Sequence, residues 1–194
     1  IAQAVHEYVH ASEMAMEAGF DGVELHAANG YLIDQFLNIA SNQRTDAYGG
    51  TPANRVRFAL EVAKAVAAAI GAERTGIRLS PFGGFSDMAT WDGLEAQFTE
   101  LAAGLGKLKL AYIHIVDHSS MGMPPVPLRM KEEIRDAFGG TIIVSGGLDK
   151  AKAEEALQQG LGQLVAFGRS FLANPDLVER LHANAPLNKV DPKT

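Results

Sequence analysis

The chain has 194 residues, of which 47% are hydrophobic and 21% charged, and this is the composition of one globular domain with its own core. Its net charge of −6 argues against a nucleic-acid partner, because binding phosphates requires clustered Lys and Arg. The absence of cysteine excludes a disulfide framework and thiolate metal sites, and without a signal segment or long apolar run the sequence predicts a cytoplasmic protein with no membrane partner.

Helical and strand patterns alternate from the amino-terminal end of the chain. Residues 2–18 have apolar side chains at helical spacing, and Gly19 supplies the left-handed residue expected just after a helix. The short apolar run over residues 20–26 fits a buried strand that opens into a loop. The chain begins at Ile1 rather than Met, which indicates a processed or partial chain.

The same alternation continues downstream. Thr51 and Pro52 are typical of a helix N-cap and first helical residue, and the helix they start precedes a strand over 75–80. Asp149 is expected to cap a later helix, and Asn174 with Pro175 to start the last one. Further helices are expected over 94–105, 130–138 and 149–160, and further strands over 110–116, 141–145 and 164–168.

About five strand–helix units are present, and their strands read as the continuous apolar runs of a parallel sheet covered on both faces. A closed (β/α)8 barrel needs eight units and typically about 250 residues. Five parallel strands also suit an open doubly wound sheet. Periodicity alone therefore leaves these two architectures open.

Several motifs follow one another along nearly the whole chain. They are AGFDGVELHAANGYLIDQFL over residues 18–37, Gly76-Ile77-Arg78-Leu79-Ser80, Ser145-Gly146-Gly147 and Ala166-Phe167-Gly168-Arg169. In this order they resemble the Old Yellow Enzyme family of FMN-dependent ene-reductases. The resemblance implies an α/β fold, a (β/α)8 TIM barrel holding FMN at the carboxyl ends of its strands, of which residues 1–194 supply about strands 4 to 8. The amino-terminal barrel segment, in the same protein or as a separate chain, would then be a partner.

His26, Asn29 and Tyr31 lie close together after a predicted strand, where this kind of barrel presents catalytic side chains. The resemblance implies that His26 and Asn29 donate hydrogen bonds to the activating oxygen of an alkene, and that Tyr31 protonates the α-carbon. A phenol with an ordinary pKa of about 10 stays protonated at neutral pH. Taken singly, each residue is better explained as a strand-end histidine, a turn residue or a packed aromatic.

Glycine-rich turns follow two late predicted strands, Gly146 with Gly147 and Gly168 with Arg169. Glycine lets a phosphate approach backbone N–H groups, and arginine adds a charged fork. Loops at this position form the usual phosphate site of such barrels, although paired glycines can simply make a turn. The resemblance implies that the ligand is FMN.

Arg78 ends an apolar strand, where an unpaired cation would be costly, so it should meet an anion or a polarised oxygen. The resemblance implies that this partner is the pyrimidine edge of FMN. A salt bridge to Glu24 or Asp117 is the alternative that the residues themselves favour.

A competing motif lies in the first helix, where His6-Glu7-Tyr8-Val9-His10 matches the H-E-x-x-H pattern of zinc peptidases. A catalytic zinc site needs a third ligand, and the apolar stripe through Val5 and Val9 places the two histidines near the solvent side of the helix. We therefore expect no metal.

The resemblance implies a functional hypothesis: an NAD(P)H-dependent FMN ene-reductase that reduces the C=C bond of activated alkenes such as enones, maleimides and nitroalkenes. The hydride has to come from the flavin, since no side chain supplies one. The alternative is a non-catalytic barrel fragment that folds and binds FMN only with its missing segment, because an open sheet exposes two edges.

Overall fold

The computed structural model describes residues 1–191, in which helices and parallel strands alternate. The strands are β1 Val23–Ala27, β2 Thr75–Leu79, β3 Tyr112–Val116, β4 Thr141–Ser145 and β5 Leu164–Ala166. The helices are α1 Ala2–Glu17, α2 Leu32–Leu37, α3 Pro52–Ile70, α4 Leu94–Leu108, α5 Leu128–Phe138, α6 Lys150–Gln158, α7 Arg169–Ala173 and α8 Leu177–Ala183.

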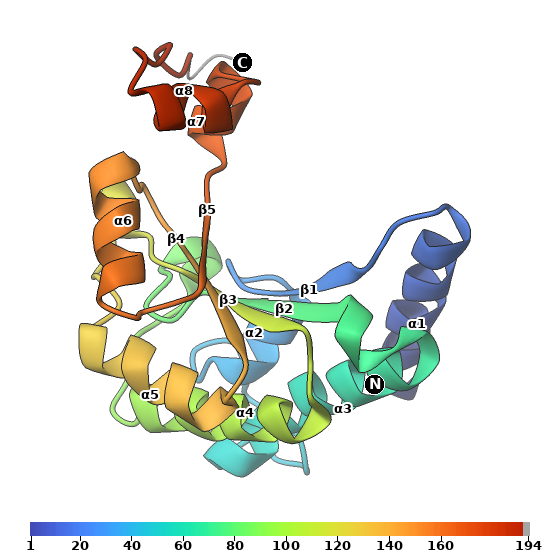
Figure 1. Ribbon diagram of the computed structural model, residues 1–194. Coiled ribbons are helices and arrows are strands. Elements are labelled where there is room, and N and C mark those ends of the chain that lie inside the picture. The colour runs from blue at the N-terminus through green and yellow to red at the C-terminus, as the bar shows by residue number, and fades with distance from the viewer. Residues whose placement is uncertain (192–194) are drawn as a thin grey trace.

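The sheet order distinguishes between the two architectures that the sequence left open. The five strands pair in the order β1-β2-β3-β4-β5, all parallel, so each strand lies beside the next one in the chain. Helices α1, α3, α4 and α5 contact one another in sequence, and Figure 1 shows α2 to α5 together on one side of the sheet. A doubly wound sheet would carry helices on both faces. The arrangement is therefore a segment of a (β/α) barrel.

The strands separate their side chains by face. Apolar residues such as Leu25, Ile77 and Ile113 are at most 4% exposed and belong to the core that the helices cover. The alternate positions of the first three strands carry polar side chains, and the register places His26 beside Arg78 and Arg78 beside His114. Side chains along a strand alternate between the two faces of a sheet. The expected apolar character on both faces thus holds only for the face under the helices.

Most of the predicted element boundaries agree with the structure. Gly19 has a φ of 89° directly after α1, where its N–H and the next one bond back to carbonyls of the last turn. The side chain of Thr51 accepts a hydrogen bond from the N–H of Asn54 at 3.3 Å, and that of Asp149 accepts one from the N–H of Lys152 at 2.9 Å. Both expected N-caps are confirmed.

The carboxy-terminal helices differ from the prediction. Asn174 does not start a helix: it ends α7, and the chain turns before α8 begins at Leu177. Its buried side chain accepts a hydrogen bond from the N–H of Asn188 at 2.7 Å and donates to the carbonyl of Ser170 at 2.9 Å. An Asn-Pro pair that resembles a helix start therefore forms a junction between two short helices. Figure 1 shows α7 and α8 beyond the carboxyl end of β5.

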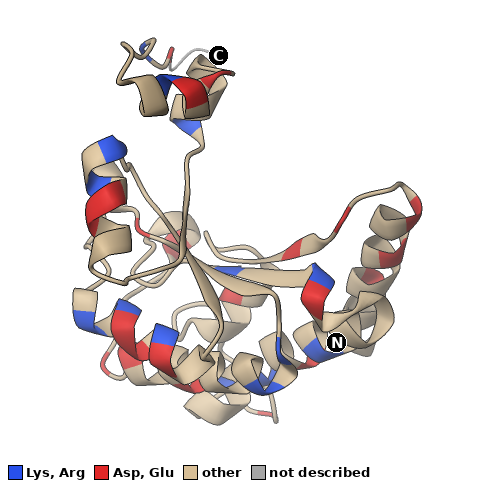
Figure 2. Ribbon diagram, in the orientation of Figure 1, with Lys and Arg blue, Asp and Glu red and all other residues tan. Residues whose placement is uncertain are grey.

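Figure 2 shows Lys and Arg interspersed with Asp and Glu along the helices, without a stripe of one sign. Within residues 1–191, no helix is both long enough and apolar enough to cross a membrane.

Candidate active site at the carboxyl ends of the strands

The loop after β1 is held in a fixed shape by two hydrogen bonds to its backbone. Asn29 and Gly30 are both left-handed, with φ of 59° and 76°. The N–H of Asn29 donates to the Ser80 hydroxyl at 2.8 Å, and the N–H of Gly30 donates to the Asp34 carboxyl at 2.9 Å. A Cβ on Gly30 would lie 2.5 Å from that of Ser86, so only glycine fits there. This turn brings the three predicted catalytic residues to one place.

His26 and Tyr31 face each other across this turn, with ring centroids 4.8 Å apart and tilted by 42°. Tyr31 is 60% exposed, so its hydroxyl is accessible to a ligand. Burial and then the nearby Arg78 cation lower the pKa of His26. The imidazole is therefore neutral at physiological pH, with one N–H to donate.

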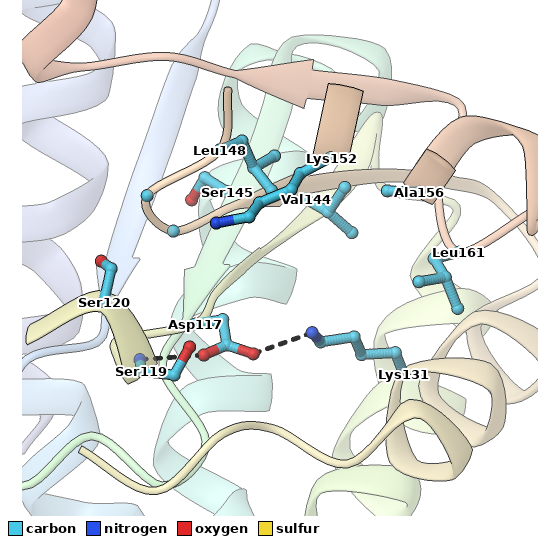
Figure 3. A pocket seen from close by; sticks show the side chains of 12 residues that line it. Asp117, Ser119, Ser120, Lys131, Val144, Ser145, Leu148, Lys152, Ala156 and Leu161 are labelled. Carbon is cyan, nitrogen blue, oxygen red and sulfur yellow. Dashed lines mark hydrogen bonds and ion pairs between the residues drawn. The ribbon is translucent and has the colours of Figure 1, made fainter. Parts of the chain in front are cut away.

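Arg78 does not form either of the salt bridges that the sequence allowed. Glu24 pairs with His114 at 2.9 Å, and Asp117 pairs with Lys131 at 2.8 Å, as Figure 3 shows for the second pair. Within residues 1–191, the Arg78 Nε is buried and has no hydrogen-bond partner. A buried guanidinium N–H without an acceptor is costly, which points to an acceptor supplied by a ligand.

The side chain of Asn29 has a partner that the sequence did not indicate. The Nε2 atom of His118, in the loop after β3, lies 2.7 Å from the Asn29 Oδ1 atom. His118 is 9% exposed, and its ring packs edge-on against the ring of Phe85, with the two ring centroids 4.7 Å apart. Nothing in the spacing of His118 marks it as a site residue, because its contact with Asn29 joins positions 89 residues apart.

The glycine turns after β4 and β5 lie at the same edge of the sheet, since these strands pair side by side. A Cβ on Gly146 would lie 1.9 Å from the Asp117 carbonyl oxygen, and one on Gly147 would lie 2.3 Å from the Ser120 Cβ. Packing within the chain is therefore enough to require glycine at both positions. Gly168 differs, because a Cβ there would meet nothing within 4 Å. The exposed Arg169 that follows reaches Ser120 through a 3.4 Å hydrogen bond.

A cavity of about 410 Å³ opens beside the Gly146-Gly147 turn. Its walls carry the Asp117–Lys131 pair, and the Asp117 carboxylate also accepts the N–H of Ser119 at 3.0 Å (Figure 3). Burial raises the pKa of Asp117, but the hydrogen bonds from Lys131 and Ser119 together outweigh it and lower the pKa, so the carboxylate is charged and holds the loop after β3 in place.

The H-E-x-x-H residues of α1 lie apart from this edge. His6, Glu7 and His10 are all exposed on the outer helix. Within residues 1–191, no three His, Cys, Asp or Glu side chains come together in a way that could hold a metal ion.

Comparison with known proteins identifies the family. A family model described as NADH:flavin oxidoreductase / NADH oxidase family matches residues 1–188. The chain belongs to this family. A solved structure described as an Old Yellow Enzyme homologue from Zymomonas mobilis superposes with a TM-score of 0.92 at 35% identity, covering 99% of this chain and 54% of that one, which confirms the resemblance seen in the sequence motifs.

Among curated relatives, putative 12-oxophytodienoate reductase 11 of Oryza sativa subsp. japonica is 48% identical over 98% of this chain and 52% of its own length. The 12-oxophytodienoate reductase 2 of Arabidopsis thaliana is 44% identical over 98% and 51%. Among solved structures, morphinone reductase superposes with a TM-score of 0.95 at 42% identity, covering 99% of this chain and 51% of that one. The chain thus spans about half the length of the proteins it matches.

Proposed function

We propose that this chain supplies the carboxy-terminal half of an FMN-dependent, NAD(P)H-driven reductase of activated alkenes. The observation that carries the proposal is the convergence of His26, Asn29 and Tyr31 on one turn beside Arg78, whose buried Nε lacks an acceptor. Family membership supports flavin chemistry, and morphinone reductase, a structural neighbour, has been solved in complex with tetrahydroNAD. Enones, maleimides and nitroalkenes are the proposed substrates.

The residues present fit FMN. Arg78 would donate to the pyrimidine edge of the flavin, which has the oxygen acceptors that its buried Nε requires. The backbone at Gly146, Gly147 and Gly168, with the Arg169 guanidinium, would hold the phosphate, and the open space at Gly168 leaves room for it. When bound, FMN supplies the hydride, and NAD(P)H is the source of that hydride.

The protein side chains would act on the alkene. His26 and Asn29 donate hydrogen bonds to the carbonyl or nitro oxygen, which makes the β-carbon electrophilic and stabilises the negative charge that develops on that oxygen. The lowered pKa of His26 keeps its imidazole neutral, so it acts as a hydrogen-bond donor rather than an acid. Tyr31, exposed on the same turn, would donate its phenolic proton to the α-carbon.

We further propose that an amino-terminal segment completes the barrel, in the same protein or as a separate chain. Both β1 and β5 have one neighbour each in the described sheet. Helices α2 to α5 lie together on one side of that sheet (Figure 1), and Glu24, Arg78 and His114 occupy strand positions that alternate with the apolar core residues Leu25, Ile77 and Ile113. The alternative to an enzyme that is active by itself is therefore a non-catalytic half-barrel, which folds and binds FMN only together with the amino-terminal segment.

The replacement Tyr31→Phe tests the proposed acid. The FMN-loaded protein used in these tests is this chain together with the amino-terminal segment that completes its barrel. In stopped-flow measurements on it, we expect Tyr31→Phe to slow oxidation of the reduced flavin by 2-cyclohexenone about 100-fold or more, because general acid catalysis typically contributes this much. Reduction of the flavin by NADPH should change by less than about twofold. Tyr48→Phe, which removes a hydroxyl bonded to Glu61 away from the site, is the matched control and should affect neither step.

Two results would contradict these assignments. Equal slowing of both half-reactions by Tyr31→Phe would remove Tyr31 as the acid. If the FMN-loaded protein reduced no enone, maleimide or nitroalkene with NADH or NADPH, the proposed function itself would fail.

A further inference from the structure

The amide of Asn29 has two ends, and which end faces the substrate decides whether it can stabilise negative charge. The Nδ2 group donates hydrogen bonds, whereas the Oδ1 atom only accepts them and would repel a substrate oxygen. The hydrogen-bond partner of one end therefore determines which end is left to face the substrate. In this structure the partner is His118, whose Nε2 lies 2.7 Å from the Asn29 Oδ1.

The backbone of Asn29 is fixed independently of its side chain. Its left-handed conformation, with φ at 59°, is held by the hydrogen bond from its N–H to the Ser80 hydroxyl. Its side chain could still rotate about the Cα–Cβ and Cβ–Cγ bonds. The contact with His118 restricts this rotation, and within residues 1–191 the Nδ2 end of the amide has no hydrogen-bond partner.

His118 is itself held on several sides. Phe85 packs against its ring at 4.7 Å, and the next residues form a tight turn in which the N–H of Met121 bonds to the His118 carbonyl at 2.8 Å. The preceding Asp117 is fixed by Lys131 and by the N–H groups of Ser119 and Val126. A side chain held in this way can impose its orientation on a neighbour at low entropic cost.

We propose that His118 is a positioning residue for alkene reduction: it donates its Nε2–H to the Asn29 Oδ1 and so presents the Asn29 Nδ2 group to the substrate oxygen. This inference rests on the proposed function and deepens it. Burial, followed by the Arg78 cation, lowers the pKa of His118, which keeps the ring neutral at physiological pH. The hydrogen on Nε2 then leaves Nδ1 unprotonated.

The consequence for catalysis is preorganisation. An amide already oriented before the substrate arrives does not lose rotational freedom on binding, and its dipole already points at the oxygen where charge develops. Without His118, the Asn29 side chain samples orientations that include the repulsive one. The binding of any ligand through a carbonyl oxygen should therefore weaken, whether or not the ligand can be reduced.

The test is a double-mutant cycle on the FMN-loaded protein with His118→Leu and Asn29→Ala, singly and together. The probe is cyclohexanone, a saturated ketone that offers the oxygen but no C=C bond, and its binding is followed by the change in flavin absorption. We expect His118→Leu to raise the Kd of the ketone about five- to tenfold, the effect of one lost hydrogen bond. In the Asn29→Ala background the same change should alter the Kd by less than about twofold.

Two further variants serve as controls for the double-mutant cycle. His118→Gln keeps an N–H donor near the Nε2 position and should restore the Kd to within about twofold of wild type. His182→Leu removes an exposed histidine of α8 and should leave the Kd unchanged. If His118→Leu does not fold, His118→Asn replaces it, since its donor sits near the Nδ1 position and cannot reach Asn29.

The outcomes separate this inference from the proposed function. The positioning role is overturned if His118→Leu raises the Kd of cyclohexanone by the same factor in the wild-type and Asn29→Ala backgrounds. It is also overturned if His118→Gln does not restore the Kd. Coupled ketone binding in a protein that reduces no activated alkene supports the orientation of Asn29 by His118 and contradicts only the proposed reaction. A wild-type protein that reduces activated alkenes but shows no saturable ketone binding overturns the positioning role and leaves the proposed reaction standing.

Discussion

Asp34 lies beneath the turn that carries the candidate catalytic residues, and it is 4% exposed. Its carboxyl group accepts the N–H of Gly30 at 2.9 Å and a hydrogen bond from Ser80, which in turn accepts the N–H of Asn29. Burial, only partly offset by these hydrogen bonds, raises the pKa of Asp34 to about 6. The ionisation of Asp34 is thus coupled to the hydrogen bonds that hold the turn at Asn29 and Gly30.

The pH dependence of this link has a definite sign. Because the pKa of Asp34 is higher in the folded than in the unfolded protein, its stabilising effect is fully present below about pH 4 and is lost as pH rises through 6. Relative to Asp34→Asn, which keeps an acceptor for Gly30, the wild-type protein should lose on the order of 3 kcal/mol of unfolding free energy between pH 4 and pH 7. Urea unfolding at several pH values measures this, with Asp21→Asn in the exposed loop before β1 as control. Parallel pH profiles for wild type and Asp34→Asn would contradict it.

At the scale of single residues, those that lie close together in the sequence could be recognised as a group, and the family resemblance supplied their roles. His26 lies near the end of β1 and Asn29 and Tyr31 lie in the loop after it, so one sequence motif contains all three. The roles assigned to them remain predictions that the kinetic tests address. His118 could not be found in this way, because its contact with Asn29 depends on β1 and β3 lying two strands apart in one sheet.

At the scale of elements, side chains that cap a helix N-terminus predicted where two of the helices begin. Thr51 and Asp149 were recognised because their side chains accept N–H groups of the first helical turn, and both do so. Helix α2, at 6 residues, was not predicted, because it is too short to show an apolar stripe of helical period. The junction at Asn174 was misassigned because its buried side chain bonds to distant Asn188 rather than to the next helix.

The cap of α6 gives an element-scale prediction. Asp149→Ala should lower the free energy of unfolding by about 1 kcal/mol, because the N–H of Lys152 loses its acceptor. Asp149→Asn should retain most of this stability, since asparagine caps helices about equally well. Thermal and urea unfolding measure the difference, with Glu154→Ala on the exposed side of the same helix as control. A loss as large for the Asn variant as for the Ala variant would show that charge, rather than capping, is what matters.

At the scale of the whole molecule, periodicity predicted the order of strands and helices but not the architecture. An open sheet and a barrel segment share the same alternation, and they differ in whether the helices cover one face or both. That difference depends on crossovers between strands, which no local pattern encodes. The motif resemblance predicted the barrel, and the sequential strand order confirmed it.

The unpaired edges of the sheet lead to a final prediction about the isolated chain of 194 residues. Strands β1 and β5 each present one edge without a neighbour in the described sheet, and unpaired parallel edges invite association with other chains. We expect the chain alone to self-associate with rising concentration in sedimentation experiments and to bind FMN at well below one equivalent. Co-expression with the amino-terminal half of a relative such as Arabidopsis 12-oxophytodienoate reductase 2 should yield a yellow one-to-one complex, because added strands pair the edges and cover Arg78 and His114. A monomeric isolated chain that holds stoichiometric FMN and reduces an enone would contradict this requirement, because one half of the barrel would then be enough for the chemistry.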